Sequence, residues 1–270
     1  MINLRHELEM IAKGSPWLLR TAWQLRKPLS AMRLIGPTFF RRRLVERGYD
    51  VVIDGFPRSA NSFACDAFVV AQGHSVADAT TKGYAIKIAN HVHAPAQFML
   101  AKKYGVPAML VLREPVAAAL SWLVYTHERD AASAWMHGYD GQGAAKLVLR
   151  DYIRFHRPLL AIRDAFVVAP FDEVTSDFGQ SIERLNRRFG TSFSRFDHTK
   201  ESEAAIFQVM RDRVEDRSKR LGVDLARTFH FPDEQKRAMR DRLAAELDTE
   251  ELAPLRTAAT ALYLELMATV

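Results

Sequence analysis

Cysteine is almost absent from this chain of 270 residues, which contains only Cys65. A single cysteine cannot form an internal disulfide, and no cluster of Cys and His has the spacing of zinc ligands, so we expect a reducing compartment and no structural metal. The chain also lacks an uncharged apolar run of 18 residues, and charged residues interrupt its first thirty positions. Neither a membrane span nor a secretion signal is predicted, and we expect a cytoplasmic protein.

Low-complexity tracts and linkers rich in proline and glycine are absent as well, which argues against disorder and repeat architectures. With 270 residues, of which 48% are hydrophobic, the chain is long enough to form one large domain. We predict a single domain over residues 1–270. It would consist of a basic helical N-terminal segment (1–50), an α/β core (51–190) and a helical C-terminal part (191–270).

The positive charge of the chain is concentrated at its N-terminal end. Residues 1–50 contain ten Lys and Arg against four Asp and Glu, whereas the rest of the chain has 28 of each, so this segment accounts for the net charge of +6. It could touch the inner face of an anionic membrane as a peripheral contact. The simpler interpretation is a set of helices that pack on the domain with their basic faces in solvent. The residues concerned are Trp17, Leu18, Leu19, Trp23, Leu25, Phe39, Phe40 and Arg41–Arg43.

Short apolar runs alternate with helical patterns between residues 51 and 190. Strands are predicted at 51–56, 84–90, 108–113 and 165–171, and helices at 59–73, 96–104, 115 onward, 142–163 and 177–189. This alternation is typical of a three-layer α/β/α fold with a central parallel sheet. From residue 201 onward the pattern is helical, with breaks near Gly222, Pro232 and Thr249, and we expect these helices to cover one side of the sheet.

The turn after the first predicted strand has the position of a phosphate-binding loop. Residues 55–62 read GFPRSANS and connect a strand to a helix, where backbone N–H groups and the helix dipole favour an anion. Compared with the pattern G-x-x-x-x-G-K-[ST], the second glycine is Ala60 and the lysine is Asn61. Because that lysine serves the β and γ phosphates of a nucleoside triphosphate, its loss argues against ordinary ATP or GTP hydrolysis. A cation stands inside the loop instead, at Arg58.

A second motif follows the third predicted strand. Arg113 ends the apolar run 108–112 and would emerge at the carboxyl edge of the sheet, where ligands of open α/β folds bind. Ser121 falls two turns into the next helix. A purely structural alternative is a salt bridge from Arg113 to Glu114 or another carboxylate, with Ser121 only packing in the helix. The presence of the phosphate loop at a neighbouring strand end favours a joint anion site.

Together, the two motifs resemble those of the sulfotransferases that use 3'-phosphoadenosine 5'-phosphosulfate (PAPS). In that family a Pro-[Lys/Arg]-Ser-Gly-Thr-Thr-like loop binds the 5'-phosphosulfate, and an Arg-x-Pro element followed by a serine binds the 3'-phosphate. The resemblance continues more weakly through residues 167–174 and 187–190. It implies a P-loop NTPase-like sulfotransferase fold, PAPS as sulfonate donor, adenosine 3',5'-bisphosphate as product, and no metal. The donor-binding residues that it implies are Pro57, Arg58, Ser59, Ala60, Asn61, Ser62, Phe63, Arg113 and Ser121.

The chain departs from the family pattern in two places. Ala60 replaces the usual glycine and would be strained if the loop needs a positive φ there. Asn61 and Ser62 replace two threonines, although their side chains still offer donors to phosphate oxygens. The chain also lacks the Gly-rich basic loop near the C-terminus that helps to hold the 3'-phosphate in the soluble branch of the family. Other residues must therefore complete that site.

Sulfonate transfer to a hydroxyl requires a general base and a cation beside the transferring group. Arg58 is the expected cation. His91 and His93 follow the second predicted strand, at a place similar to that of the catalytic histidine in the soluble branch, and both rings would share a face if the backbone is extended. We prefer His91 as the base, with His93 orienting it or contacting the acceptor. Lys87 could reach the sulfonate from the same strand, but a solvated surface position is the simpler interpretation.

The acceptor has no recognisable motif, and a hydroxyl-bearing carbohydrate or glycolipid is our preferred class. Five aromatic residues could stack on a sugar, although core packing explains most of them more simply: Trp122, Tyr125, Trp135, Tyr139 and Tyr152. One alternative is a P-loop kinase or other nucleotide-dependent transferase. Another is a module without catalytic activity that binds membrane or nucleic acid, although a nucleic-acid partner is not favoured.

Overall fold

A computed structural model of the protein describes residues 4–25, 43–74, 86–128, 143–221 and 234–270. Its strands are β1 (Val51–Gly55), β2 (Ile88–Ala89), β3 (Ala108–Leu112) and β4 (Val167–Pro170). Its α-helices are α1 (Leu4–Gly14), α2 (Pro16–Gln24), α4 (Asn61–Ala71), α6 (Pro95–Tyr104), α7 (Pro115–Glu128), α9 (Ala144–His156), α10 (Phe171–Ser176), α11 (Phe178–Phe189), α12 (Lys200–Leu221), α13 (Glu234–Leu247) and α14 (Ala253–Met267). Two 3₁₀ segments are η2 (Arg157–Ala165) and η4 (Glu250–Leu252).

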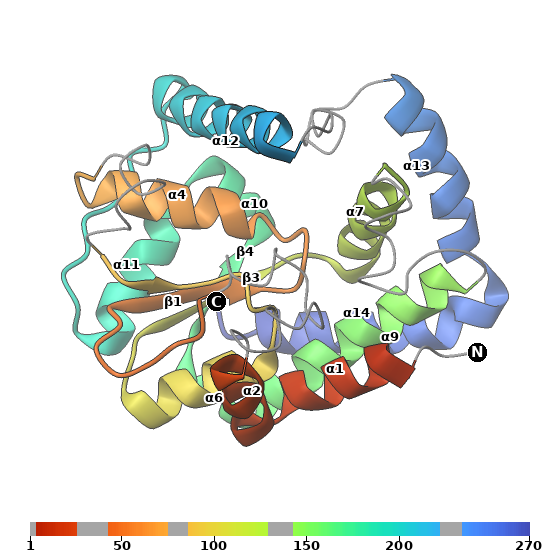
Figure 1. Ribbon diagram of the computed structural model, residues 1–270, viewed down its shortest axis with the longest axis horizontal. Helices are drawn as coiled ribbons and strands as arrows, with labels where there is room; N and C mark the ends of the chain where they lie inside the picture. The colour runs from red at the N-terminus through yellow and green to blue at the C-terminus, as the bar shows by residue number, and fades with distance from the viewer. Residues whose placement is uncertain (1–3, 26–42, 75–85, 129–142, 222–233) are drawn as a thin grey trace.

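The strands form one parallel sheet in the order β2-β1-β3-β4, with helices on both faces (Figure 1). Helices α4, α10, α11 and α12 lie on one face, and α1, α2, α6, α9 and α14 lie on the other. All residues of β1 and β3 are buried, which is the pattern of central parallel strands. The predicted α/β architecture, with a parallel sheet between helical layers, is therefore confirmed.

Two predicted elements differ from the observed ones. The strand expected at 84–90 is reduced to Ile88–Ala89 within the described residues, followed by an isolated bridge from Asn90 to Arg43. The helix expected at 142–163 ends at His156 and continues as η2, with a kink at Ile162 where φ is −130°. Pro158 explains the change, because it has no N–H to continue the α-helical hydrogen bonds.

The C-terminal helices divide between the two faces, so the expectation that they cover one side of the sheet is wrong. Helix α12 contributes Ile206 and Met210 to the core beneath α4, where Arg213 also forms a bidentate ion pair of 2.8 and 2.9 Å with the buried Asp66. Helices α13 and α14 pack on α7 and α9, on the opposite face. The predicted break near Thr249 is confirmed, and the breaks near Gly222 and Pro232 lie outside the described residues.

The N-terminal segment begins with two helices that pack on the domain. Leu19 and Trp23 are buried, whereas Trp17 and Leu25 are exposed, so the apolar residues that we grouped together have different environments. Phe39, Phe40, Arg41 and Arg42 lie outside the described residues. None of the described helices has both the length and the apolar character that crossing a membrane requires.

His156 is a buried neutral histidine beneath the phosphate loop. Its Nδ1 lies 2.8 Å from the carbonyl oxygen of Tyr152, and its ring contacts those of Phe56 and Phe155. Burial lowers the pKa of His156 from 6.5 to about 3, against a raising contribution from the hydrogen bond to Tyr152. Because the unfolded chain binds this proton near its ordinary pKa and the folded chain does not, His156 favours unfolding as the pH falls below 6.5.

We predict that the protein loses about 2 kcal/mol of unfolding free energy, relative to a His156→Leu variant, between about pH 7.5 and about pH 5. Urea unfolding of both proteins at several pH values measures this difference. The comparison cancels the titration of the other histidines, which both proteins contain. The pKa of Asp54 is lowered, so its titration affects the unfolding free energy only below the pH range of this measurement. Parallel pH dependences for the two proteins would contradict the prediction.

Candidate functional site

The order in which the chain adds strands to the sheet reverses between β1 and β3, at the carboxyl ends of these two strands. From β1 the chain runs through α4 on one face to β2, and then through α6 on the other face to β3, which pairs with β1 on its opposite side. Connections that leave neighbouring strands on opposite faces open a crevice at the carboxyl edge, where open α/β sheets bind ligands. The loop 56–60 and Arg113 both follow these two strand ends.

The loop between β1 and α4 has a constrained backbone. Arg58 and Ala60 adopt positive φ angles of 70° and 68°, and Ala60 occupies the cap position of α4. The positive φ foreseen for Ala60 as a source of strain is therefore present, and it explains why glycine suits this position. Helix α4 begins at Asn61, two residues later than predicted, because this left-handed turn precedes it.

Helix α4 begins without a side-chain cap, which leaves polar groups at its N-terminus available to a ligand. The first helical hydrogen bond runs from the Ala64 N–H to the Ala60 carbonyl at 3.0 Å, so the amides of Asn61, Ser62 and Phe63 have no acceptor within the helix. The Ser59 hydroxyl is fully buried and has no hydrogen-bond partner among the described residues. Unsatisfied donors at a helix N-terminus are suited to an anion.

The two sequence motifs meet directly in space. The Arg58 Nε donates to the Ser121 hydroxyl at 3.2 Å, and its guanidinium lies 4.7 Å from the centre of the Tyr125 ring. The Arg113 Nη1 donates to the Arg58 carbonyl at 2.9 Å. Arg58 is thus in contact with two residues that are far away in the sequence, Ser121 by 63 positions and Arg113 by 55. The loop 56–60, the end of β3 and helix α7 therefore share one site.

Arg113 is held by its surroundings rather than by a salt bridge to Glu114. Its guanidinium lies 4.0 Å from the centre of the Phe171 ring, and its carbonyl accepts a hydrogen bond of 2.7 Å from the Tyr152 hydroxyl. The Glu114 carboxylate instead accepts hydrogen bonds from the first amides of α7. Among the described residues, Arg113 therefore forms no salt bridge with Glu114 or with another carboxylate.

Arg113 has a second arginine and two carboxylates in its neighbourhood. Burial lowers the pKa of Arg113, and the nearby charge of Arg240 on α13 lowers it further, while Asp172 and Glu114 oppose this effect. The repulsion between the half-buried Arg113 and the exposed Arg240 would be relieved by an anion that binds near both. Sequence reasoning missed Arg240, since α13 carries no motif, although α13 packs on α7 beside the end of β3.

His91 and His93 lie together beside the phosphate loop. Their ring centres are 5.6 Å apart, but their backbones have φ angles of 56° and 52°, so the extended conformation assumed for residues 91–93 is wrong. The His93 Nδ1 lies 2.7 Å from the Gly55 carbonyl and 3.2 Å from the Asp54 carboxylate. His93 is therefore fixed against the last residues of β1, immediately before the loop.

Asp54 is the buried centre of this arrangement, and sequence reasoning overlooked it. Its carboxylate accepts hydrogen bonds of 3.0 Å from the amides of Val92 and His93, and one of 2.9 Å from the Gly55 amide. Burial alone would raise the pKa of Asp54, but the charges and hydrogen bonds of its neighbours, His93 first, hold it below its ordinary value. The signal was present in the sequence, since Asp54 is the one charged residue of β1.

Several expected site residues have other roles. The Asn61 side chain donates one of its two N–H groups to the Phe56 carbonyl at 2.9 Å and closes the loop. The Phe63 ring is buried against Phe196 and Phe207, which leaves only its backbone for a ligand. Lys87 is exposed and precedes β2, with its amide bound to Asp50 at the amino edge of the sheet, away from the site.

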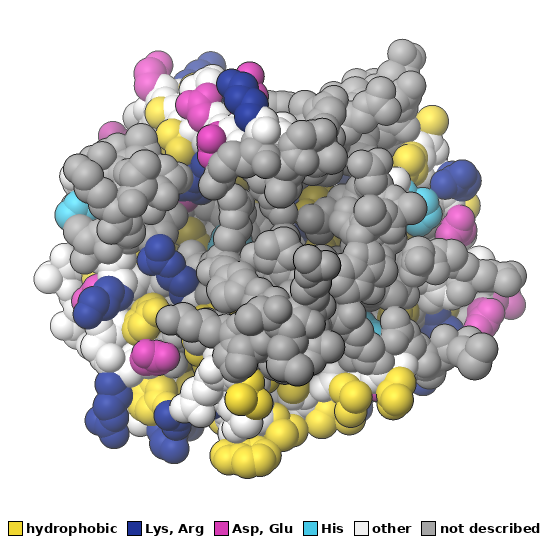
Figure 2. Space-filling view, viewed as in Figure 1, with side chains coloured by type: hydrophobic (Ala, Val, Ile, Leu, Met, Phe, Trp, Pro, Cys, Tyr) yellow, Lys and Arg dark blue, Asp and Glu magenta, His cyan; other side chains and the backbone are white. Residues whose placement is uncertain are grey.

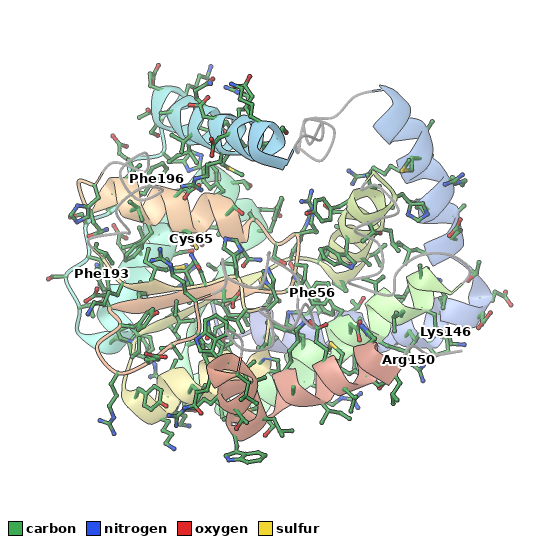
Figure 3. All side chains as sticks on the ribbon, viewed as in Figure 1. Phe56, Cys65, Lys146, Arg150, Phe193 and Phe196 are labelled. Atoms are coloured by element: carbon green, nitrogen blue, oxygen red, sulfur yellow. The ribbon has the colours of Figure 1, made fainter. Side chains whose placement is uncertain are left out.

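The aromatic candidates for acceptor binding are mostly part of the core. Tyr152 and Trp122 are buried, and Tyr125 stacks on Trp122 with its centre 5.6 Å away. Phe56, labelled in Figure 3, packs its ring against Tyr152 with a centre distance of 5.2 Å. Trp135 and Tyr139 lie outside the described residues.

A cavity of about 130 Å³ lies between helices α1 and α2 and the loop that carries both histidines. Its walls are mainly apolar, with Leu19 and Trp23 on the helices and Val92 on the loop. Among the described residues, no cluster of three or more His, Cys, Asp or Glu side chains is placed to bind a metal ion.

No protein-family model matches the chain, and no curated protein sequence matches it significantly. A functional assignment therefore depends on the geometry of this site and on the resemblance of its two motifs.

Proposed function

We propose that this protein is a sulfotransferase with a P-loop NTPase-like fold, which transfers a sulfonate group from PAPS to an acceptor hydroxyl. The observation that carries this proposal is the meeting of the two motifs at one sheet edge, through the contacts of Arg58 with Ser121 and of Arg113 with the Arg58 carbonyl. If the two degenerate motifs matched only by chance, there would be no reason for both to lie in the same crevice. The absence of the loop lysine favours this donor over a nucleoside triphosphate.

The residues of the crevice fit a donor with two separate anionic groups. The 5'-phosphosulfate would bind the uncapped amides at the start of α4, the buried Ser59 hydroxyl and Arg58. The 3'-phosphate would bind near Arg113 and Ser121, and Arg240 would supply the cation that a C-terminal basic loop provides in the soluble branch. When bound, PAPS supplies the activated sulfonate and a phosphate leaving group.

The geometry favours His93 over His91 as the general base. A neutral imidazole that donates its Nδ1–H to Asp54 or to the Gly55 carbonyl keeps its Nε2 lone pair for an acceptor hydroxyl. A buried carboxylate that orients the ring and stabilises its protonated form is the usual partner of such a base. In transfer, the acceptor oxygen would bond to sulfur as the bond from sulfur to the phosphate oxygen breaks, and His93 would take the hydroxyl proton.

The apolar cavity beside Val92 supports an acceptor with an apolar portion. Glu9 and Lys13 also line this cavity, but most of its wall is carbon, which gains binding free energy from hydrocarbon. Within the carbohydrate or glycolipid class, this favours the glycolipid.

Calorimetric titration with adenosine 3',5'-bisphosphate tests the donor site. We expect this ligand to bind, ATP with magnesium to bind more weakly, and Arg113→Ala to weaken the bisphosphate at least tenfold, because a charge-assisted hydrogen bond contributes about 1.5–3 kcal/mol. Lys102→Ala is the matched control, since it removes the same charge from an exposed residue at the other edge of the sheet. Preference for ATP, or no binding of the bisphosphate, would overturn the proposal.

A further inference from the structure

The outer surface of helices α1 and α2 is apolar although their inner surfaces are already packed. Leu4, Leu8 and Ile11 follow one another at helical spacing on α1 and are 57–73% exposed, and Trp17 at the start of α2 is 71% exposed. Their neighbours Leu19 and Trp23 face the core, and His6 lies 2.9 Å from the buried Asp151 of α9. Packing of the domain therefore does not account for the outer apolar residues.

These residues form a continuous band, which we call the α1–α2 face: Leu4, Leu8, Ile11 and Trp17. Figure 2 shows hydrophobic side chains gathered along the lower edge of the molecule, over α1 and α2. Exposed apolar residues that occur singly need no explanation, but a row of them on adjacent helices marks an interaction surface.

Three cations lie beside this face. Arg20 is one turn after Trp17 on α2, and its guanidinium lies 6.0 Å from the centre of the Tyr104 ring. The guanidinium of Arg47 lies 5.7 Å from the same ring, and the exposed Lys103 precedes Tyr104 at the end of α6. Within the described parts of the chain, none of these three cations forms an ion pair with a carboxylate.

The acidic residues of α1 do not offset these cations. The Glu7 carboxylate is bound by Arg154 at 2.9 Å, and Glu9 is bound by Lys13 at 2.9 Å. The surface thus combines a row of aliphatic side chains, an exposed tryptophan and the positive charge around Tyr104. A protein partner would need to match its shape, whereas an anionic bilayer accepts apolar side chains at the acyl boundary and cations at the headgroups.

We propose that the α1–α2 face, together with Arg20, Arg47 and Lys103, binds the surface of an anionic lipid bilayer. Helices α1 and α2 would lie in the interface with Leu8, Ile11 and Trp17 inserted among the acyl chains. The cations around Tyr104 would contact the phosphate groups. This inference is independent of the sulfotransferase proposal, since it requires neither the donor site nor the histidines.

Sedimentation of the full-length protein with lipid vesicles tests this inference. We expect binding to vesicles of phosphatidylcholine with phosphatidylglycerol, much weaker binding to phosphatidylcholine alone, and a decrease with added salt. Arg20→Gln/Arg47→Gln/Lys103→Gln should weaken binding to the anionic vesicles on the order of 100-fold, because each cation near such a surface contributes about a fivefold increase. Equal binding of this variant and the unaltered protein would overturn the proposal.

A second pair of variants tests how much the apolar side chains contribute to vesicle binding. Leu8→Ser/Ile11→Ser/Trp17→Ala should reduce vesicle binding at least tenfold, whereas Leu264→Ser, at a 59% exposed leucine of α14, should not change it. Thermal unfolding verifies that each variant is folded, which is expected because the altered side chains are exposed. If the unaltered protein dimerises in the absence of lipid, and the apolar variant is a monomer, the face joins two copies of the chain and the bilayer proposal is overturned.

Discussion

Replacing His93 with alanine is expected to lower the turnover number for sulfonate transfer by about 10²- to 10⁴-fold, the usual contribution of a general base. The dissociation constant for adenosine 3',5'-bisphosphate should stay nearly unchanged, because the His93 ring contacts Asp54 and Gly55 rather than the uncapped start of α4. Turnover with PAPS and an acceptor alcohol, measured together with calorimetric binding of the bisphosphate, separates the two effects.

His91→Ala is the matched control for this prediction, since its ring is only 5.6 Å from that of His93. We expect a loss of turnover of less than about tenfold, as His93 keeps its carboxylate partner in this variant. A severe loss in His91→Ala with a small loss in His93→Ala would restore the assignment that we preferred from the sequence. Similar small losses in both variants would exclude a histidine base.

Gly55→Ala is expected to prevent stable folding. A Cβ at this position would lie 2.1 Å from the Val111 carbonyl oxygen of the neighbouring strand, and both atoms belong to the centre of the sheet. Since neither backbone can move without separating β1 from β3, we expect a loss of more than about 4 kcal/mol, a large part of the stability of an ordinary domain. The yield of soluble protein and its urea unfolding curve measure the loss.

Gly14→Ala provides the comparison. Gly14 is the last residue of α1, and a Cβ there would meet no atom within 4 Å. We expect this variant to be as stable as the unaltered protein or slightly more stable, because alanine has the higher helix propensity. If Gly55→Ala unfolds at the same urea concentration as Gly14→Ala, the close approach of β1 and β3 is not present in solution.

The elements that depend on neighbouring residues could be predicted from the sequence. A short β-branched run located β1, and a continuous apolar run located β3, because strands buried on both faces are rich in such side chains. The helix ending at Phe189 was located because Gly190 adopts the left-handed conformation that glycine favours. The positions of Arg58 and Arg113 at strand ends followed from the same local patterns.

Which of these residues meet depends on the three-dimensional packing of the elements. The contact of Arg58 with Ser121, the orientation of His93 by Asp54, and the nearness of Arg240 to Arg113 all join residues more than 35 positions apart. Local sequence patterns do not specify such contacts, because the contacts depend on the order of the strands in the sheet and on the face on which each helix packs. The same reason explains the division of the C-terminal helices between the two faces of the sheet.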